Sequence, residues 1–174
     1  MNSIFTIGHS TRTLDDFVAL LRIADVRMVA DIRSAPSSRR CPQFDGDALS
    51  QALGRHQIGY SHLGALGGHR PKSRTIEPDT NAFWDNQSFH NYADYAMGED
   101  FRAGLTALID LGRHARTAMM CAEAVWWRCH RRIVADYLLL RDIPVVHILS
   151  PTAMKEAAMT PAARPCGSVL CYPR

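Results

Sequence analysis

The stretch that decides the fold is Ala118-Met119-Met120-Cys121, an all-apolar run followed by the polar turn that contains Glu123. Continuous apolar runs of this kind are typical of strands that are buried on both faces of a parallel sheet. Such a sheet needs a layer of helices on each side. A helical pattern over 129–140 and a further apolar run over 145–149 follow it. The stretch therefore predicts an α/β fold.

The chain on either side continues this alternation of strands and helices. Thr13 is placed to cap a helix, with Asp16 three residues later. The apolar patterns predict strands over 4–7, 28–32, 58–63, 118–121 and 145–149, and helices over 14–24, 47–56, 92–112 and 129–140. This order predicts a single three-layer α/β domain, with a mostly parallel sheet of about five strands and helices on both faces.

Two segments depart from the pattern. Residues 71–90 are rich in Pro, Ser, Asn and Asp and predict a long loop inserted into the domain. Residues 151–174 are rich in Pro and Ala and predict a C-terminal extension. The α/β domain itself is expected to span residues 1–150.

Composition and charge exclude several classes of protein. The 174 residues are 47% hydrophobic and 21% charged, which excludes a disordered chain, a collagen-like chain and a disulfide-stabilised miniprotein. The net charge of +3 does not by itself require a nucleic acid. Of the 20 basic residues 18 are arginine, and those beside strand ends could converge on one small anion. The sequence indicates neither an oligomeric state nor a cofactor.

The sequence predicts a cytoplasmic protein without a membrane partner. The N-terminus has no basic leader, and no apolar run approaches the ~20 residues of a membrane-spanning helix. Five cysteines, an odd number without secretory features, predict reduced thiols.

Candidate site residues follow from the rule that ligands of open parallel sheets bind at the carboxyl ends of the strands. Cys121, between a strand and a helix, is either a thiolate nucleophile or a small buried residue. Glu123, if placed near Trp126 and Trp127, is either an acid or base with a raised pKa or an ion-pair partner of an arginine. Cys129 shares a helical stripe with apolar residues and is interpreted as part of the core. Residues at the predicted strand ends are His9, Ser10, Asp31, Arg33, Ser34, Tyr60, His62, Cys121, Glu123 and Ser150.

An ordered set of short motifs extends this argument. They are Thr6-Ile7-Gly8-His9-Ser10, Asp31-Ile32-Arg33, Gly59-Tyr60, Leu66-Gly67-Gly68 with Arg70, Cys121-Ala122-Glu123 and Cys129-His130-Arg131. Together they resemble the domain-of-unknown-function family 488 (DUF-488), over about residues 4–149. The resemblance implies a compact cytoplasmic α/β domain and supplies no reaction. Its motifs include most of the strand-end residues.

Three functions remain open. The first is an enzyme acting on a small anionic or phosphate-bearing substrate, such as a nucleotide or a nucleic-acid base that would stack on Tyr60, Trp126 or Trp127. The second is a non-catalytic nucleotide or nucleic-acid binding module. The third is a metal or thiol-redox site of Cys121, Glu123, Cys129 and His130, although their spacing matches no recognised zinc pattern and no metal ligand is assigned. For the enzyme, the expected catalytic residues are Glu123, Cys121, Asp31 and His9, and the expected substrate-binding residues are Ser10, Arg33, Tyr60, Gly67, Gly68, Arg70, Arg128, His130 and Arg131.

Overall fold

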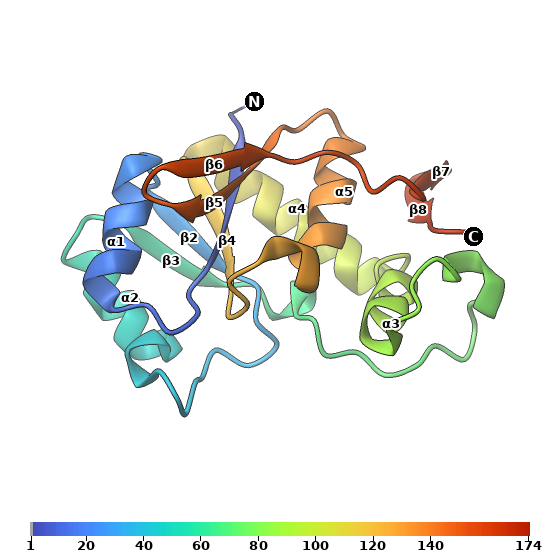
Figure 1. The fold of residues 1–174 in the computed structure, drawn as a ribbon, viewed down its shortest axis with the longest axis horizontal. Coiled ribbons are helices and arrows are strands. Elements are labelled where there is room, and N and C mark those ends of the chain that lie inside the picture. The colour runs from blue at the N-terminus through green and yellow to red at the C-terminus, as the bar shows by residue number, and fades with distance from the viewer. Residues whose placement is uncertain (1) are drawn as a thin grey trace.

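The computed structural model describes residues 2–174 and contains a six-stranded sheet of order β3-β2-β4-β1-β5-β6 (Figure 1). The first five strands in the chain run parallel, and β6 pairs antiparallel with β5. The predicted α/β fold with a mostly parallel sheet is confirmed. The strands are β1 (Ile4–Gly8), β2 (Met28–Asp31), β3 (Gly59–His62), β4 (Thr117–Cys121), β5 (Val145–Ser150) and β6 (Ala153–Glu156).

Helices cover both faces of the sheet, as the apolar run at β4 predicts. Adjacent residues of β4 face opposite cores: Met120 packs with the side chains of α1 and α2, and Met119 packs with those of α3, α4 and α5. The helices are α1 (Leu14–Ile23), α2 (Gly46–Gly54), α3 (Gln87–Tyr95), α4 (Glu99–His114) and α5 (Arg131–Leu139). Short 3-10 helices are η1 (Pro42–Phe44), η2 (Gly64–Leu66), η3 (Pro78–Asn81) and η4 (Trp126–Arg128).

Helix boundaries confirm one expectation and correct another. The Thr13 side chain accepts a hydrogen bond from the Asp16 amide at 3.1 Å, so it caps α1 as predicted. The single helix expected over 92–112 is instead two, because the chain breaks before Gly98, the N-cap of α4. The first of the two, α3, already begins inside the predicted 71–90 loop, where Asn86 caps it.

The strand order determines where the functional loops meet. β4 lies between β2 and β1, although it follows them by many residues in the chain. The loops that leave the carboxyl ends of these three strands are therefore neighbours.

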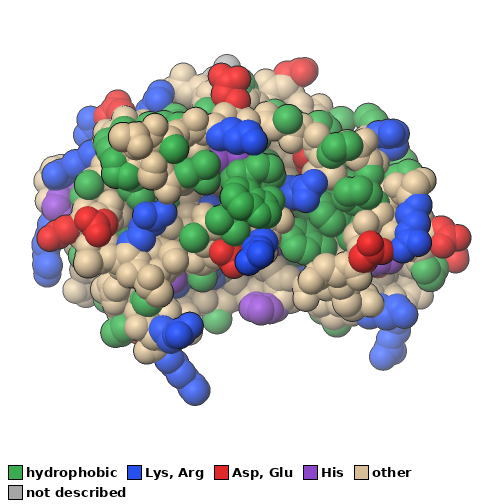
Figure 2. Space-filling model, in the orientation of Figure 1, with side chains coloured by type: hydrophobic (Ala, Val, Ile, Leu, Met, Phe, Trp, Pro, Cys, Tyr) green, Lys and Arg blue, Asp and Glu red, His purple; other side chains and the backbone are tan. Residues whose placement is uncertain are grey.

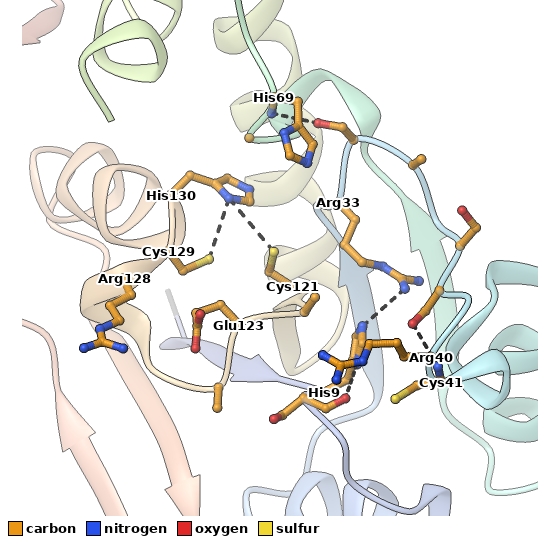
Figure 3. A pocket seen from close by; sticks show the side chains of 18 of the residues that line it. His9, Arg33, Arg40, Cys41, His69, Cys121, Glu123, Arg128, Cys129 and His130 are labelled. Carbon is orange, nitrogen blue, oxygen red and sulfur yellow. Dashed lines mark hydrogen bonds between the residues drawn. The ribbon is translucent and has the colours of Figure 1, made fainter. Parts of the chain in front are cut away.

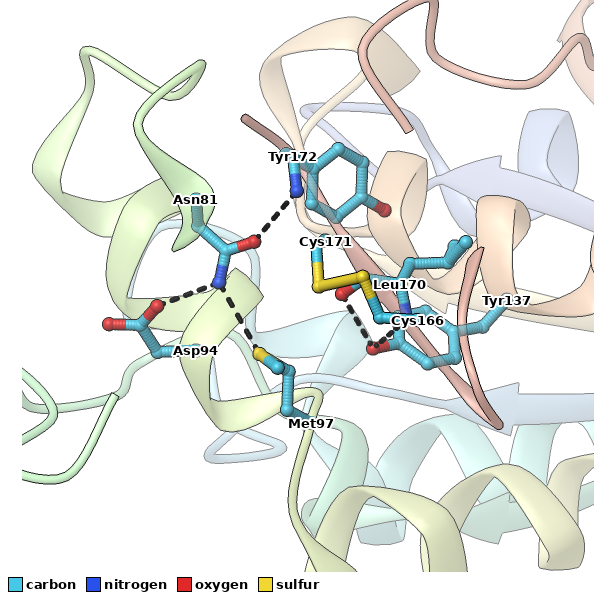
Figure 4. The surroundings of a disulfide bond; sticks show 8 residues. All are labelled: Asn81, Asp94, Met97, Tyr137, Cys166, Leu170, Cys171 and Tyr172. Atoms are coloured by element: carbon cyan, nitrogen blue, oxygen red, sulfur yellow. Dashed lines mark hydrogen bonds between the residues drawn. A yellow bond between two sulfur atoms is a disulfide. The ribbon is translucent and has the colours of Figure 1, made fainter. Parts of the chain in front are cut away.

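The C-terminal segment is packed against the domain. Leu170 and Tyr172 are buried in the core on the α5 side, and the Tyr172 hydroxyl donates a hydrogen bond to the buried Asp136 carboxylate at 3.0 Å. Asn81 accepts a hydrogen bond from the Tyr172 amide at 3.0 Å and donates one to Asp94 at 2.8 Å (Figure 4). The tail is thus tied both to α5 and to the segment inserted before α3.

The expectation of reduced thiols is wrong for two of the five cysteines. Strands β7 (Arg164–Cys166) and β8 (Val169–Cys171) form a tight antiparallel hairpin. The hairpin brings the Cα atoms of Cys166 and Cys171 to 6.1 Å, and the two side chains form a disulfide (Figure 4). Cys41, Cys121 and Cys129 are free.

Among residues 2–174, no helix combines the length and the apolar character needed to cross a lipid bilayer.

Burial of the tail gives a stability prediction. Replacing Leu170 by Ala should lower the free energy of unfolding by about 2–5 kcal/mol, because a fully buried side chain is removed and a cavity is left. Urea denaturation measures this loss. The control is Met154→Ala on β6, where the side chain is 42% exposed and a change within about 0.5 kcal/mol is expected. Equal effects in the two variants would mean that the tail is not part of the cooperative fold.

Candidate functional site

A cleft of about 680 Å³ opens at the carboxyl ends of β1, β2 and β4 (Figure 3). Its volume is within the range of small-molecule sites. Predicted residues that line it are His9, Ser10, Arg33, Gly68, Cys121, Glu123, Arg128 and His130, and Cys129 joins them. Most of the expected site residues thus lie around one cavity at the strand ends.

Backbone pairing holds two of the loops together beyond the strands. The amides of His9 and Ser10 donate hydrogen bonds to the carbonyls of Cys121 and Ala122, both at 2.9 Å. Gly8 lies directly against the next turn, where a Cβ atom would overlap the Glu123 carbonyl. Only glycine lets the β1 and β4 loops approach this closely.

Arg33 is a buried cation on one wall of the cleft. Its Nε and Nη2 donate to the Asp31 carboxylate at 2.9 and 2.6 Å, and Nη2 also donates to the Phe44 carbonyl at 2.7 Å. Nη1 lies 3.4 Å from the His9 Nε2. Among the described residues these contacts use four of the five guanidinium N–H groups, which leaves one Nη1 hydrogen to interact with a ligand.

Asp31 and Tyr60 position Arg33 and do not line the cleft. The Asp31 carboxylate accepts four hydrogen bonds, three from Arg33 and one from the Tyr60 hydroxyl at 2.6 Å. Burial opposes the charge on Arg33, but Asp31 outweighs it and raises the pKa of Arg33 above its usual value. Burial and the bond to Asp31 raise the pKa of Tyr60. The carboxylate expected to act as a catalytic acid or base is saturated by these bonds and is a positioning residue.

His9 is held neutral beside Arg33. Its Nδ1 is 2.8 Å from the Ser10 carbonyl, which can only accept, so Nδ1 carries the proton and Nε2 accepts from Arg33. The ring stacks on Phe44 with the centroids 4.4 Å apart. Burial, together with the charge of Arg33, lowers the pKa of His9.

Across the cleft from Arg33, two cysteines and a histidine form a cluster that we call the thiol-imidazole cluster: Cys121, Cys129 and His130 (Figure 3). The His130 Nδ1 lies 3.6 Å from the Cys129 sulfur and 4.0 Å from the Cys121 sulfur. The opposite ring nitrogen, Nε2, is 3.0 Å from the Ile32 carbonyl, so the ring is fixed with Nδ1 facing the two sulfurs. The three ligand atoms lie within 4.8 Å of one another and could hold a metal ion.

Arg131 makes the cluster electrostatically unusual. Its side chain is only 1% exposed, and no carboxylate pairs with it among residues 2–174. Nε donates to the Cys129 sulfur at 3.2 Å, and Nη2 donates to the Glu123 carbonyl. Burial acts to raise the pKa of Cys129, but the thiol of Cys121, His130 and Arg131 together lower it well below its ordinary value. The hydrogen bond to Cys129, together with burial, raises the pKa of Cys121. Of the two sulfurs, Cys129 is therefore the one that its surroundings favour as a thiolate.

The interpretation of Cys129 as a core residue therefore describes its burial but misses its chemistry. The signal was available in the motif Cys129-His130-Arg131, because a helix that begins there places two basic side chains beside the sulfur.

Glu123 differs from expectation in its surroundings. Its side chain is exposed, and its carboxylate accepts a hydrogen bond from the Val125 amide at 3.2 Å. The apolar pocket expected from the two tryptophans does not form, because Trp126 stacks on His147 and Trp127 is 47% exposed. The backbone carbonyl of Glu123, and not its carboxylate, contacts Arg131.

Gly67, Gly68 and Arg70 shape the neighbouring loop. A Cβ atom on Gly67 would lie 2.5 Å from the Ser34 Cα, and one on Gly68 would lie 2.6 Å from the His130 Nδ1. Arg70 donates to the carbonyls of Gly64 and Gly67 and lies over the Tyr95 ring, and it does not line the cleft. Of the three, only Gly68 borders the cavity.

An outer wall of the cleft comes from α3. Phe89 lines the cavity and stacks on Trp84 with the centroids 5.0 Å apart. Trp84 in turn packs edge-on against Tyr172 at 5.2 Å. A series of aromatic rings thus connects the C-terminal tail to the cleft.

One family model matches the chain: the family described as Domain of unknown function DUF488 aligns with residues 13–138, more than half of the 174 residues. The chain belongs to the DUF488 family. The DUF488 match contains Arg33 and the whole thiol-imidazole cluster, whereas His9 and Ser10 precede it. No curated protein matches the chain.

Beneath the turn that carries the cluster, His147 is a buried base. Trp126 stacks flat on it at 4.4 Å, and its Nδ1 is 2.8 Å from the Thr6 hydroxyl. Burial and the charges of Arg131 and Lys155 lower the pKa of His147 to about 4, from an ordinary value of 6.5.

This shift predicts acid sensitivity. Between pH 6.5 and about 4 the unfolded chain binds a proton at His147 and the folded chain does not, so the free energy of unfolding should fall as the pH falls through this window. Urea unfolding at several pH values measures the slope. His147→Gln should remove part of the slope, while His114→Gln, at an exposed position on α4, should leave it unchanged. Identical slopes in the native protein and His147→Gln would contradict the assignment.

Proposed function

We propose that this DUF488 protein is an enzyme that binds a small anionic, phosphate-bearing substrate in the cleft. The observation that carries the proposal is the unused Nη1 hydrogen of Arg33, a buried guanidinium held in place by Asp31 and open to the cavity. A guanidinium fixed in this way loses little side-chain freedom when it binds a phosphate or a carboxylate.

Two further arginines support anion binding. Arg40 and Arg128 are exposed and line the same cavity, so both can approach the charge of a ligand that is bound by Arg33. Cys121, Cys129 and His130 lie across the cavity from Arg33, with both sulfurs facing the His130 ring (Figure 3). Groups that can take part in a reaction therefore face groups that can hold the substrate, with His9 and Glu123 at the border.

Binding without catalysis is the less favoured alternative. Tyr60, Trp126 and Trp127, which would have stacked a base, do not line the cleft. The basic side chains on the face shown in Figure 2 are spread among hydrophobic and neutral ones and form no continuous stripe along which a nucleic-acid backbone could lie.

Anion binding is tested with inorganic phosphate and isothermal titration calorimetry on the full chain. Arg33→Gln should weaken binding roughly 10- to 100-fold, because a hydrogen bond to a charged group is lost. Arg40→Gln and Arg128→Gln should each weaken it by a smaller factor without unfolding the protein, since both side chains are exposed. Arg102→Gln, on the exposed face of α4, is the matched charge control. Binding that is unchanged in all three cleft variants would overturn the anion site.

Catalysis is tested by a screen of small phosphate-bearing compounds, nucleotides included. Turnover of any active compound should be lost in Cys121→Ser and strongly reduced in Glu123→Gln, with the fold checked by circular dichroism. Arg102→Gln should retain full turnover. If both cleft variants remain as active as the native protein, the cleft is not the active site.

A further inference from the structure

The thiol-imidazole cluster has the composition of a zinc site. Cys121 and Cys129 offer two sulfurs and His130 offers a nitrogen, the ligand types that zinc prefers. Cys121 ends β4, and Cys129 and His130 directly precede α5. We propose that these three residues bind a Zn²⁺ ion whose fourth coordination position opens into the cleft. Sites with three protein ligands and one open position are typical of catalytic zinc.

The distances suit a tetrahedral ion. With Zn–S near 2.3 Å and Zn–N near 2.0–2.1 Å, neighbouring ligand atoms of a tetrahedron are separated by about 3.6 Å for sulfur and nitrogen. The Nδ1 atom of His130 is 3.6 Å from the Cys129 sulfur and 4.0 Å from the Cys121 sulfur. A shift of a few tenths of an ångström at Cys121, the more exposed of the two thiols, would bring its distance from Nδ1 to this value.

The surroundings orient the ligands as metal sites require. The Nε2 of His130 donates to the Ile32 carbonyl at 3.0 Å, the kind of outer hydrogen bond that fixes the ring and leaves Nδ1 free to coordinate. Gly68 packs so closely against Nδ1 that any side chain there would displace the ring. The backbone amide and Nε of Arg131 both donate to the Cys129 sulfur, which stabilises its thiolate.

The charges around the zinc site favour an anion at its open coordination position. Zinc binding releases the proton of Cys121 to solvent, so two thiolates balance the charge of Zn²⁺, and the neutral imidazole adds none. The buried Arg131 then leaves the site with one uncompensated positive charge. An anionic oxygen as the fourth ligand would neutralise it, and Arg33, Arg40 and Arg128 favour the same sign of ligand in the same cavity.

Zinc binding goes beyond the proposed function and can be measured without it. The probe is ZnCl₂ added to metal-free full-length protein under reducing conditions, in competition with a chromophoric zinc chelator. We expect one equivalent to bind. Cys121→Ser should weaken the affinity by more than about 100-fold, since a loss of outer-shell partners alone costs about 10–100-fold. Gly68→Ala should weaken it by a smaller factor through displacement of His130.

Matched controls separate this site from other thiols. Cys41→Ser removes a free thiol of the same cleft that lies outside the cluster, and it should keep the native affinity. Cys166→Ser should also keep it, which excludes binding at the reduced hairpin.

Cobalt provides a second readout if a variant folds poorly. Co²⁺ in the native protein should show a sulfur-to-metal charge-transfer band, and in folded Cys121→Ser that band should lose about half its intensity, because one of the two thiolates is gone. Three results would each overturn the proposal: no stoichiometric zinc binding by the native protein, affinity unchanged in Cys121→Ser, or affinity lost equally in Cys41→Ser. Phosphate titration of the metal-free protein tests Arg33 separately, so either result can fail without the other.

Discussion

The site depends on a guanidinium that is buried without a carboxylate. Arg131 is taken out of water at the start of α5, and such a charge is costly unless a negative or strongly polar group compensates it. Its partners are the Cys129 sulfur and the Glu123 carbonyl. Together with Cys121 and His130, Arg131 lowers the pKa of Cys129. The bond from Arg131 to the Glu123 carbonyl holds the β4 loop against Gly8. Removing either Arg131 or the Cys129 sulfur would leave the other buried without its charge partner.

Arg33, which lines the cleft, and Arg131, which lies buried behind it, differ in how their charge is compensated. The charge of Arg33 is neutralised by Asp31, two residues earlier in the chain. Arg33 therefore offers a ligand a directed hydrogen bond and little net charge. Arg131 has only a thiolate, and any group that takes electron density from that sulfur leaves the arginine uncompensated. The charge of Arg33 is therefore already compensated, and Arg33 offers a ligand only a hydrogen bond. The net charge on the Arg131 side depends on what binds at the Cys129 sulfur.

Much of this arrangement could be predicted from sequence. The apolar run at β4 indicated a sheet covered on both faces, and the strand-end rule collected His9, Arg33, Cys121 and Glu123 at one edge. The strand-end rule could not assign a role to each residue, because a role depends on the direction in which the side chain points. Asp31 is at the expected strand end, but its carboxylate points to Arg33 and not into the cavity. The tail was equally beyond reach, because β6 forms through pairing with β5 and carries no apolar pattern of its own.

The ring series that joins Tyr172 through Trp84 to Phe89 has a consequence for synthesis. Every reactive side chain of the cleft precedes residue 132, so a nascent chain holds the full chemical complement long before the tail emerges from the ribosome. The wall formed by α3 is backed by Trp84 and Tyr172, and the Tyr172 amide donates a hydrogen bond to Asn81. A chain cut short within the last dozen residues would keep its thiols and arginines but would hold them beside an unsupported wall. The residue that supports this wall is thus encoded after every reactive residue of the cleft.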